Sequence, residues 1–283
     1  MINTIKYLTF VLKTSISDLE EIIEHIDEYY VSWDKPKRNK ETGDVLVDGD
    51  GNTIIRQLNT TKKGLKKIQN RLYRFLISKI KTPQYAFGGI PKRDNVLNAK
   101  HHQGNKFIFT TDLQSFFPSI SNRQVFNMFC EHGFSPTVSR ILTQLTTYKN
   151  ELPQGVPTST LIANLVFKTT GDKIIDFANQ NKLTFTIFVD DITLSSKFDF
   201  KDKIDTILSI IKNDGYKISN KKTFYKTKNP IITGVVCQNN KLKLQQSFYK
   251  KLKRLKSESV KDKNSEIKYH GTLMYNKKVN SMN

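Results

Sequence analysis

Two adjacent carboxylates, Asp190 and Asp191, interrupt the most strand-like segment of the chain, LTFTIFVDDITLSS. Apolar and β-branched residues flank the pair, and the segment contains no lysine or arginine. Aspartate is a common turn residue, but a two-residue hairpin turn favours Asn-Gly or Gly-containing pairs because it needs positive φ. Two neighbouring carboxylates also repel each other unless a cation lies between them. A hairpin turn and a metal site therefore both remain open from spacing alone.

A third acid, Asp112, ends the predicted strand FIFTTD and has no basic partner nearby in the sequence. One single and one double acid at strand ends are what two-metal phosphoryl transfer requires. In that chemistry one carboxylate from each strand bridges two Mg²⁺ ions about 4 Å apart. One ion lowers the pKa of an attacking hydroxyl and the other neutralises the leaving pyrophosphate. No histidine or cysteine cluster lies near the acids, which disfavours zinc.

The elements that must position these acids follow from periodicity and turn signals. We expect an amphipathic helix that starts at a capping box formed by Ser17 and Glu20. The remaining expected elements are a polar hairpin over 34–58 with its turn at DGDGN, helices over 65–80, 122–132, 136–147, 159–180 and 201–214, a buried strand over 106–113, the hairpin 183–196, the strand IITGVVC and a basic helix over 248–257. DGDGN has alternating acids like a calcium loop, but it lacks the downstream ligands, so a turn is favoured. This order predicts an α+β domain with helices on one face of a sheet.

The composition predicts a polyanionic partner. The 283 residues include 46 Lys and Arg against 26 Asp and Glu, a formal net charge of +20. Residues 237–283 carry 12 Lys and Arg against 3 Asp and Glu, so much of the excess lies near the C-terminus. No apolar run approaches the roughly 20 residues of a spanning helix, which disfavours a membrane partner. The lone cysteines Cys130 and Cys237 fit a reducing compartment. Nucleic acid in the cytoplasm is the expected setting.

Several motifs together resemble the reverse transcriptases. TDLQSFFPSI, LPQGVPTST and FVDD occur in the order of the palm motifs of that family, where the last is usually Tyr-x-Asp-Asp. NAKHH is similar to the Asn-Ala-x-x-His signature of retron reverse transcriptases, and ITGVV resembles their Val-Thr-Gly motif. IIRQLNTTKKGLKKIQ resembles the fingers segment, and HGTLMYNKKVN resembles the end of the thumb. The resemblance spans the chain from Trp33 to the C-terminus.

This resemblance implies a right-hand polymerase fold with fingers, a palm built on an antiparallel sheet with helices on one face, and a short thumb. The expected boundaries are an N-terminal helical segment over 1–32, fingers over 33–105, a palm over 106–236 with a fingers insertion around 121–158, and a thumb over 237–283.

The resemblance also implies roles for single residues at the reacting end. Asp112, Asp190 and Asp191 would be the catalytic and metal-binding carboxylates, with Asp112 and Asp190 as the bridging pair. Phe117 stands where the family keeps an aromatic gate that excludes a ribose 2′-OH. Gln154, in PQG, would line the pocket for nucleotide and template, and Arg56 would clamp the incoming triphosphate.

Further residues would contact RNA or assist the leaving group. Arg93 resembles a fingers residue that touches the template backbone, and Asn98 and His102 are the signature positions linked in retrons to recognition of the cognate RNA. Lys222 sits where polymerases often place a general acid for pyrophosphate. The basic thumb would grip the primer–template duplex.

The implied activity is RNA-directed DNA synthesis from deoxynucleoside triphosphates with two Mg²⁺ ions. For a retron enzyme the implied partner is a structured noncoding RNA that serves as template and primes through a guanosine 2′-OH, giving a branched RNA–DNA product. Such enzymes serve bacterial defence against phage, usually with a separate effector protein. Phe188 replaces the usual tyrosine of the Tyr-x-Asp-Asp box and keeps the ring.

Two alternatives remain open. One is another defence or abortive-infection reverse transcriptase with different priming, which a structured transcript encoded beside the gene would disfavour. The other is a non-catalytic RNA-binding scaffold of the same fold. Three intact acids argue against the scaffold, because without a cation they would repel each other.

Overall fold

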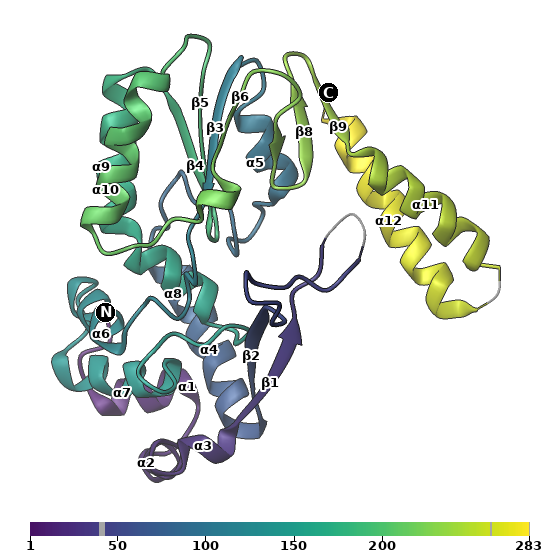
Figure 1. The fold of residues 1–283 in the computed structure, drawn as a ribbon. Coiled ribbons are helices and arrows are strands. Elements are labelled where there is room, and N and C mark those ends of the chain that lie inside the picture. The colour runs from purple at the N-terminus through teal and green to yellow at the C-terminus, as the bar shows by residue number, and fades with distance from the viewer. Residues whose placement is uncertain (40–42, 261, 283) are drawn as a thin grey trace. The chain divides into compact units, whose positions relative to one another are not determined.

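The chain forms two compact units (Figure 1). The computed structural model describes residues 1–39, 43–260 and 262–282. The first unit comprises Met1–Pro83 and Ser115–Thr169, and the second comprises Gln84–Gln114 and Thr170–Asn283.

The first unit is mainly helical. Its elements are α1 (Ile5–Leu12), α2 (Ile16–Glu24), α3 (Ile26–Tyr29), β1 (Tyr30–Pro36), β2 (Ile55–Thr61), α4 (Lys63–Lys79), α6 (Asn122–Glu131), α7 (Pro136–Thr146) and α8 (Ser159–Val166). The core forms around α4, whose Leu65, Ile68 and Leu72 lie on one face and are buried, as its periodicity predicts. Gln69 is buried among them, and its side-chain amide donates a hydrogen bond to the Leu145 carbonyl on α7 (2.9 Å).

The polar hairpin predicted over 34–58 is present. β1 and β2 pair antiparallel, with Tyr30 opposite Thr61 and Pro36 opposite Ile55. At DGDGN the Asp48 carboxylate accepts hydrogen bonds from the backbone N–H groups of Asp50 (3.0 Å) and Asn52 (2.9 Å), which is the turn expected there. Residues 40–42 of the predicted hairpin lie outside the described residues.

The second unit contains a four-stranded antiparallel sheet with the strand order β4-β5-β3-β6. Its strands are β3 (Phe107–Asp112), β4 (Thr184–Phe188), β5 (Asp191–Ser196) and β6 (Phe224–Lys226). Figure 1 shows α9 (Lys168–Gln180) and α10 (Ile204–Asn213) on one side of this sheet. Short 3₁₀ turns lie at Lys201–Lys203 and Asn220–Lys222. The predicted α+β class is confirmed.

A three-stranded sheet and two long helices complete the second unit. The sheet has the order β7-β8-β9 and is made of β7 (Ile231–Ile232), β8 (Val235–Gln238) and β9 (Lys241–Leu244), followed by α11 (Gln246–Glu258) and α12 (Lys263–Ser281). α5 (Asn95–His101) packs on this sheet through Val96 and Ala99, in one apolar cluster with Val279 of α12. The segment that bears the predicted NAKHH signature is thereby joined to the basic C-terminal helices.

Three predicted element boundaries were wrong. The capping box of α2 is Ser15 with Asp18, because those two residues exchange both hydrogen bonds (3.0 and 3.1 Å). The single helix expected over 159–180 is two helices that meet at Phe167, whose buried ring packs edge-on against Phe116.

The third error concerns IITGVVC, which is a hairpin of β7 and β8 and not a single strand. Its turn residues Thr233 and Gly234 have φ values of 46° and 89°. Positive φ at both turn residues matches the twist of a two-residue hairpin, and glycine at the second position makes it accessible.

Candidate active site

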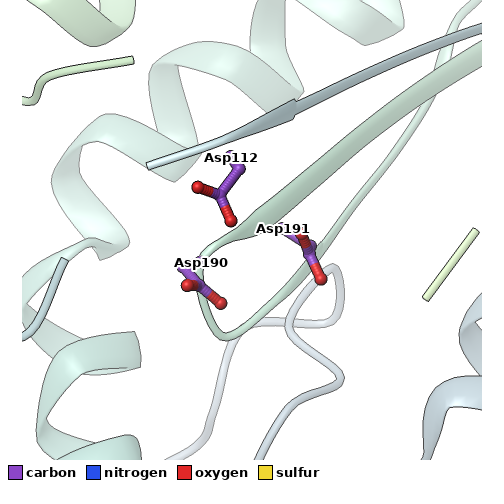
Figure 2. Close-up of side chains that lie close together, drawn as sticks. All are labelled: Asp112, Asp190 and Asp191. Atoms are coloured by element: carbon purple, nitrogen blue, oxygen red, sulfur yellow. The ribbon is translucent and has the colours of Figure 1, made fainter. Parts of the chain in front are cut away.

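The three predicted carboxylates lie together at the end of the four-stranded sheet. β3 ends at Asp112 and β5 begins at Asp191, and the antiparallel register places these two residues opposite each other. The Leu113 N–H donates to the Asp190 carbonyl (2.9 Å), which holds the turn against the end of β3. One carboxylate oxygen from each aspartate lies within 4.8 Å of the others. Figure 2 shows Asp112 on its strand and Asp190 and Asp191 at the neighbouring turn.

The turn between β4 and β5 is strained. Phe188 pairs with Asp191, so Val189 and Asp190 form a two-residue turn. Val189 has a φ of 62°, which is a genuine outlier for a β-branched side chain. Backbone strain of this kind costs on the order of 1–3 kcal/mol and persists only where the surroundings enforce it. The segment is thus both a tight hairpin turn and a carboxylate cluster.

A neighbouring segment, residues 85–89, packs against this turn, and we call it the brace. It runs parallel to the edge strand β4, where Ile187 donates to the Tyr85 carbonyl and Phe87 donates to the Ile187 carbonyl (both 2.8 Å). A Cβ on Gly88 would lie 2.5 Å from both the backbone nitrogen and Cγ2 of Val189. Only glycine therefore allows the brace to come this close to the strained turn.

Arg93 holds the brace from its other side. Its guanidinium donates to the carbonyls of Gln84 (3.1 Å) and Ala86, and it stacks over the Phe87 ring at 5.6 Å from the centroid. The predicted contact of Arg93 with the template backbone stays a prediction. These contacts in the second unit give Arg93 a structural role beside the Val189–Asp190 turn.

Lys222 lies against the cluster. Its ammonium Nζ is 2.7 Å from Oδ2 of Asp112, although 110 residues separate the two in sequence. The Lys222 side chain is 59% exposed, whereas that of Asp112 is 11% exposed. One of the three carboxylates therefore has a cationic partner that its sequence neighbourhood did not reveal.

The donor set fits a hard divalent cation. All three candidate ligands are carboxylates, the oxygen ligands that Mg²⁺ prefers in proteins. Two oxygens on opposite sides of one Mg²⁺ lie about 4.2 Å apart, since each bond is about 2.1 Å long. The observed spread of up to 4.8 Å is close to that value. The cluster is thus consistent with binding of divalent metal.

The predicted nucleotide-binding residues belong to the first unit, on three connected segments. The PQG loop lies against β2, because the Asn59 N–H donates to the Gln154 carbonyl (2.8 Å) and a Cβ on Gly155 would lie 2.6 Å from the Asn59 carbonyl oxygen. Arg56 is exposed on the same strand. Phe117 is 8% exposed. The Ile120 N–H donates to the Phe117 carbonyl, and the Leu152 N–H donates to that of Ile120. Action of these three residues on a nucleotide stays a prediction.

Asn98 and His102 are fully buried in the second unit. The two ring nitrogens of His102 lie 2.7 Å from the hydroxyls of Ser195 on β5 and Thr186 on β4. Burial lowers the pKa of His102 to about 3, and the neighbouring His101 adds to this effect. His102 therefore links the end of α5 to both strands of the hairpin that carries Asp190 and Asp191. The predicted RNA contact of the two residues stays a prediction, since neither side chain has exposed surface in this conformation.

The two segments singled out as retron signatures contact each other. Asn95, which begins α5, donates to the Thr233 carbonyl (3.0 Å) and accepts from the Thr233 hydroxyl (3.1 Å). The side chain of Asn98 also faces that hydroxyl, at 3.4 Å. NAKHH and ITGVV thus form one structural element beneath the C-terminal helices.

Comparison with known proteins identifies the family. The model of the reverse transcriptase family, described as RNA-dependent DNA polymerase, matches residues 48–273. The chain belongs to the reverse transcriptase family. The retron Ec86 reverse transcriptase of Escherichia coli is 31% identical over 221 residues, which cover 76% of this chain and 68% of that protein. The type is therefore that of the retron enzymes, RNA-directed DNA polymerases with the right-hand fold.

Other relatives have the same type but cover less. The retron Se72 reverse transcriptase of Salmonella heidelberg is 35% identical over 161 residues, which are 56% of this chain and 42% of that protein. This chain therefore spans less than half of the length of that relative.

A solved telomerase structure from Candida albicans aligns over 69% of this chain and 42% of its own, with 12% identity and a TM-score of 0.48. In the described part of the reverse transcriptase, no helix is long and apolar enough to span a bilayer.

Two features of the site were missed in the sequence. The brace at Gly88 and the strain at Val189 depend on a parallel contact between segments 101 residues apart. The Gly-Gly pair at 88 and 89 is a sequence signal of a close backbone approach, but it does not name the partner. The family resemblance places Lys222 at the reacting end, but its contact with Asp112 has no local signal in the sequence.

Proposed function

We propose that this reverse transcriptase copies a dedicated, structured noncoding RNA into DNA and that the same RNA primes the synthesis. The observation that carries the proposal is the meeting of Asp112, Asp190 and Asp191 at one end of the sheet, with carboxylate oxygens within 4.8 Å. Sequence relatives named as retron enzymes support the choice of template class.

The three carboxylates would hold two Mg²⁺ ions, with Asp112 and Asp190 as the bridging pair. When bound, such ions activate the attacking hydroxyl and stabilise charge on the α-phosphate and the leaving pyrophosphate. The contribution of the chain is to position the carboxylates. The strained Val189 turn and the register of β3 against β5 fix where the carboxylates lie, and half-burial of Asp190 and Asp191 limits competing water.

The remaining roles are part of the proposal. Arg56 would bind the triphosphate, Gln154 would line the nucleotide pocket, and Phe117 would exclude a 2′-OH. Arg93, Asn98 and His102 would serve RNA recognition, the last two by shaping α5 from inside. The C-terminal helices, rich in lysine, would hold the duplex through its phosphates. We place the enzyme in the bacterial cytoplasm, in defence against phage, with a separate effector protein.

The test is the nucleic acid that accompanies the protein from its native host. The proposal predicts one abundant RNA species joined covalently to DNA, with the DNA complementary to part of that RNA. The Asp190→Asn, Asp191→Asn variant, purified in parallel, should carry the RNA without the DNA. Recovery of mixed cellular RNA without DNA from the wild type would overturn the proposal.

A further inference from the structure

The ammonium of Lys222 bonds to one of the three carboxylates of the proposed metal site. Its Nζ lies 2.7 Å from Oδ2 of Asp112. A carboxylate oxygen that accepts a charge-assisted hydrogen bond gives up lone-pair density to that donor. Lys222 and a divalent cation therefore draw on the same carboxylate.

Hydrogen bonds hold the backbone that carries Lys222 beside Asp112. The Ser219 N–H donates to the Asp112 carbonyl (2.9 Å), and the hydroxyls of Thr223 and Thr111 lie 2.8 Å apart. Just beyond β3, the Gln114 N–H donates to the Lys217 carbonyl (2.8 Å). The segment 217–223 therefore follows the end of β3 on both sides of the catalytic carboxylate.

The side chain of Lys222 has the freedom that its backbone lacks. It is 59% exposed, and a lysine side chain is a flexible four-carbon stem with a hydrated point charge at its end. The ammonium can leave Asp112 for water without any backbone movement. Because the Lys222 end of this ion pair lies in solvent, holding the ammonium at Asp112 stabilises the chain by only a small free energy, and a divalent cation can displace it.

We propose that Lys222 is a built-in competitor of the divalent cation at Asp112. It neutralises this carboxylate until the ion binds, and it thereby raises the concentration of divalent ion that the enzyme requires. This inference rests on the proposed metal site and adds a residue that regulates its occupancy.

The test is Mn²⁺ binding to the full chain after removal of nucleic acid, measured by electron paramagnetic resonance of free Mn²⁺. Lys222→Met keeps most of the apolar stem and removes the charge. We expect it to lower the Mn²⁺ dissociation constant by about twofold to fivefold, the range that corresponds to a partly exposed ion pair. Lys222→Arg keeps a positive charge within reach of Asp112, so its Mn²⁺ dissociation constant should stay near that of the wild type.

The matched control is Lys221→Met. Lys221 is exposed in the same 3₁₀ turn, so its loss removes the same net charge from the same place. If the lysines acted only through long-range repulsion of Mn²⁺, the two Met variants would bind Mn²⁺ equally, and salt would screen the effect of both substitutions alike. Direct competition predicts that only the variant at 222 binds Mn²⁺ clearly more tightly. Equal affinity of the two Met variants, or weaker binding by Lys222→Met, would overturn the inference.

Asp112→Asn separates failure of this inference from failure of the site. Mn²⁺ binding that is unchanged in Asp112→Asn would remove the metal site and the inference together. Binding that is lost in Asp112→Asn but equal in the two Met variants would remove the inference alone.

A second readout uses thermal unfolding. Without divalent ion, Lys222→Met should unfold at a lower temperature than Lys221→Met, because its Asp112 has lost a counter-charge. At a fixed Mn²⁺ concentration the unfolding temperature of Lys222→Met should rise more than that of Lys221→Met. Stabilisation by a ligand grows as its dissociation constant falls. Equal gains for both variants would count against competition.

Discussion

Gly88 packs directly against Val189, so closely that a Cβ on Gly88 would lie 2.5 Å from the Val189 backbone nitrogen. Val189 has a φ of 62°, and the next two residues are the aspartates of the proposed metal site. The brace therefore stabilises a conformation that the turn residue would not adopt by itself. This relationship makes the geometry of the active site depend on a residue far from it in sequence.

Gly88→Ala should displace the turn. An added methyl group in tight packing costs about 1–3 kcal/mol, and a misplacement of about 1 Å at reacting groups can cost on the order of 10²-fold in rate. We expect a lower unfolding free energy and at least a tenfold slower primer extension. Chemical denaturation and single-nucleotide extension measure the two effects.

Gly271→Ala is the matched control for this variant. Gly271 lies within α12 with no atom near an added Cβ. The same substitution there should raise stability by about 0.5–1 kcal/mol, because alanine loses less backbone entropy in a helix. Equal effects at the two positions would contradict the role of the brace.

Arg93→Lys tests whether Arg93 positions the brace or contacts the template. A lysine cannot donate to the carbonyls of Gln84 and Ala86 in a planar fork. A positioning role predicts lower thermal stability and slower extension with little change in RNA affinity. If the variant is as stable as the exposed Lys92→Gln control and only RNA affinity falls, template contact is its main role.

The buried His102 should make the free energy of unfolding depend on pH. Its pKa in the folded chain is about 3, lowered mainly by burial from the ordinary histidine value of 6.5. Below about pH 6.5 His102 binds a proton in the unfolded state but stays neutral in the folded state. Its contribution to the free energy of unfolding is therefore fully present above about pH 6.5 and falls as the pH is lowered. The slope contributed is about 1.4 kcal/mol per pH unit.

Urea denaturation between pH 7.5 and 5 measures this slope, above the range where most carboxylates titrate. His102→Gln should lower stability at pH 7.5, because it alters hydrogen bonds to Ser195 and Thr186, and it should flatten the profile. His270→Gln, at an exposed position of α12, should leave the slope unchanged. A wild-type profile that is flat down to pH 5 would contradict the burial of a neutral His102.

Gly155→Ala tests the attachment of the PQG loop to β2. Gly155 has a φ of 114°, and an added Cβ would lie 2.6 Å from the Asn59 carbonyl oxygen. Gly51 also has positive φ but faces open space. We therefore expect Gly155→Ala to destabilise clearly more than Gly51→Ala, and to raise the KM for deoxynucleotides. Identical stability of the two variants would contradict a close contact between loop and strand.

The sequence predicted the parts of this site that have a local cause. The apolar run that ends at Asp112 and the hairpin that carries Asp190 and Asp191 are both visible as strand patterns, and the ordered motifs name their family. Asp112 lies opposite Asp191 because β3 and β5 are antiparallel, so that the end of β3 meets the beginning of β5.

What the sequence could not supply has a non-local cause. The contacts of Gly88 with Val189 and of Lys222 with Asp112 depend on which segments the fold brings to one edge. The helix break at Phe167 involves neither Pro nor Gly and is accompanied by packing of its ring on Phe116. The burial of His102 against β4 and β5, and of Asn98 beside Thr233, likewise depends on where the fold places the end of α5.

The central claim is that three carboxylates at one end of the sheet carry out templated DNA synthesis. Its most direct test is primer extension by the Asp190→Asn variant, with RNA affinity measured on the same preparation and with the exposed Asp205→Asn as control. We predict that extension falls by at least about 10³-fold, that RNA affinity stays within about threefold, and that the control extends normally. Extension by Asp190→Asn at the wild-type rate would contradict the account.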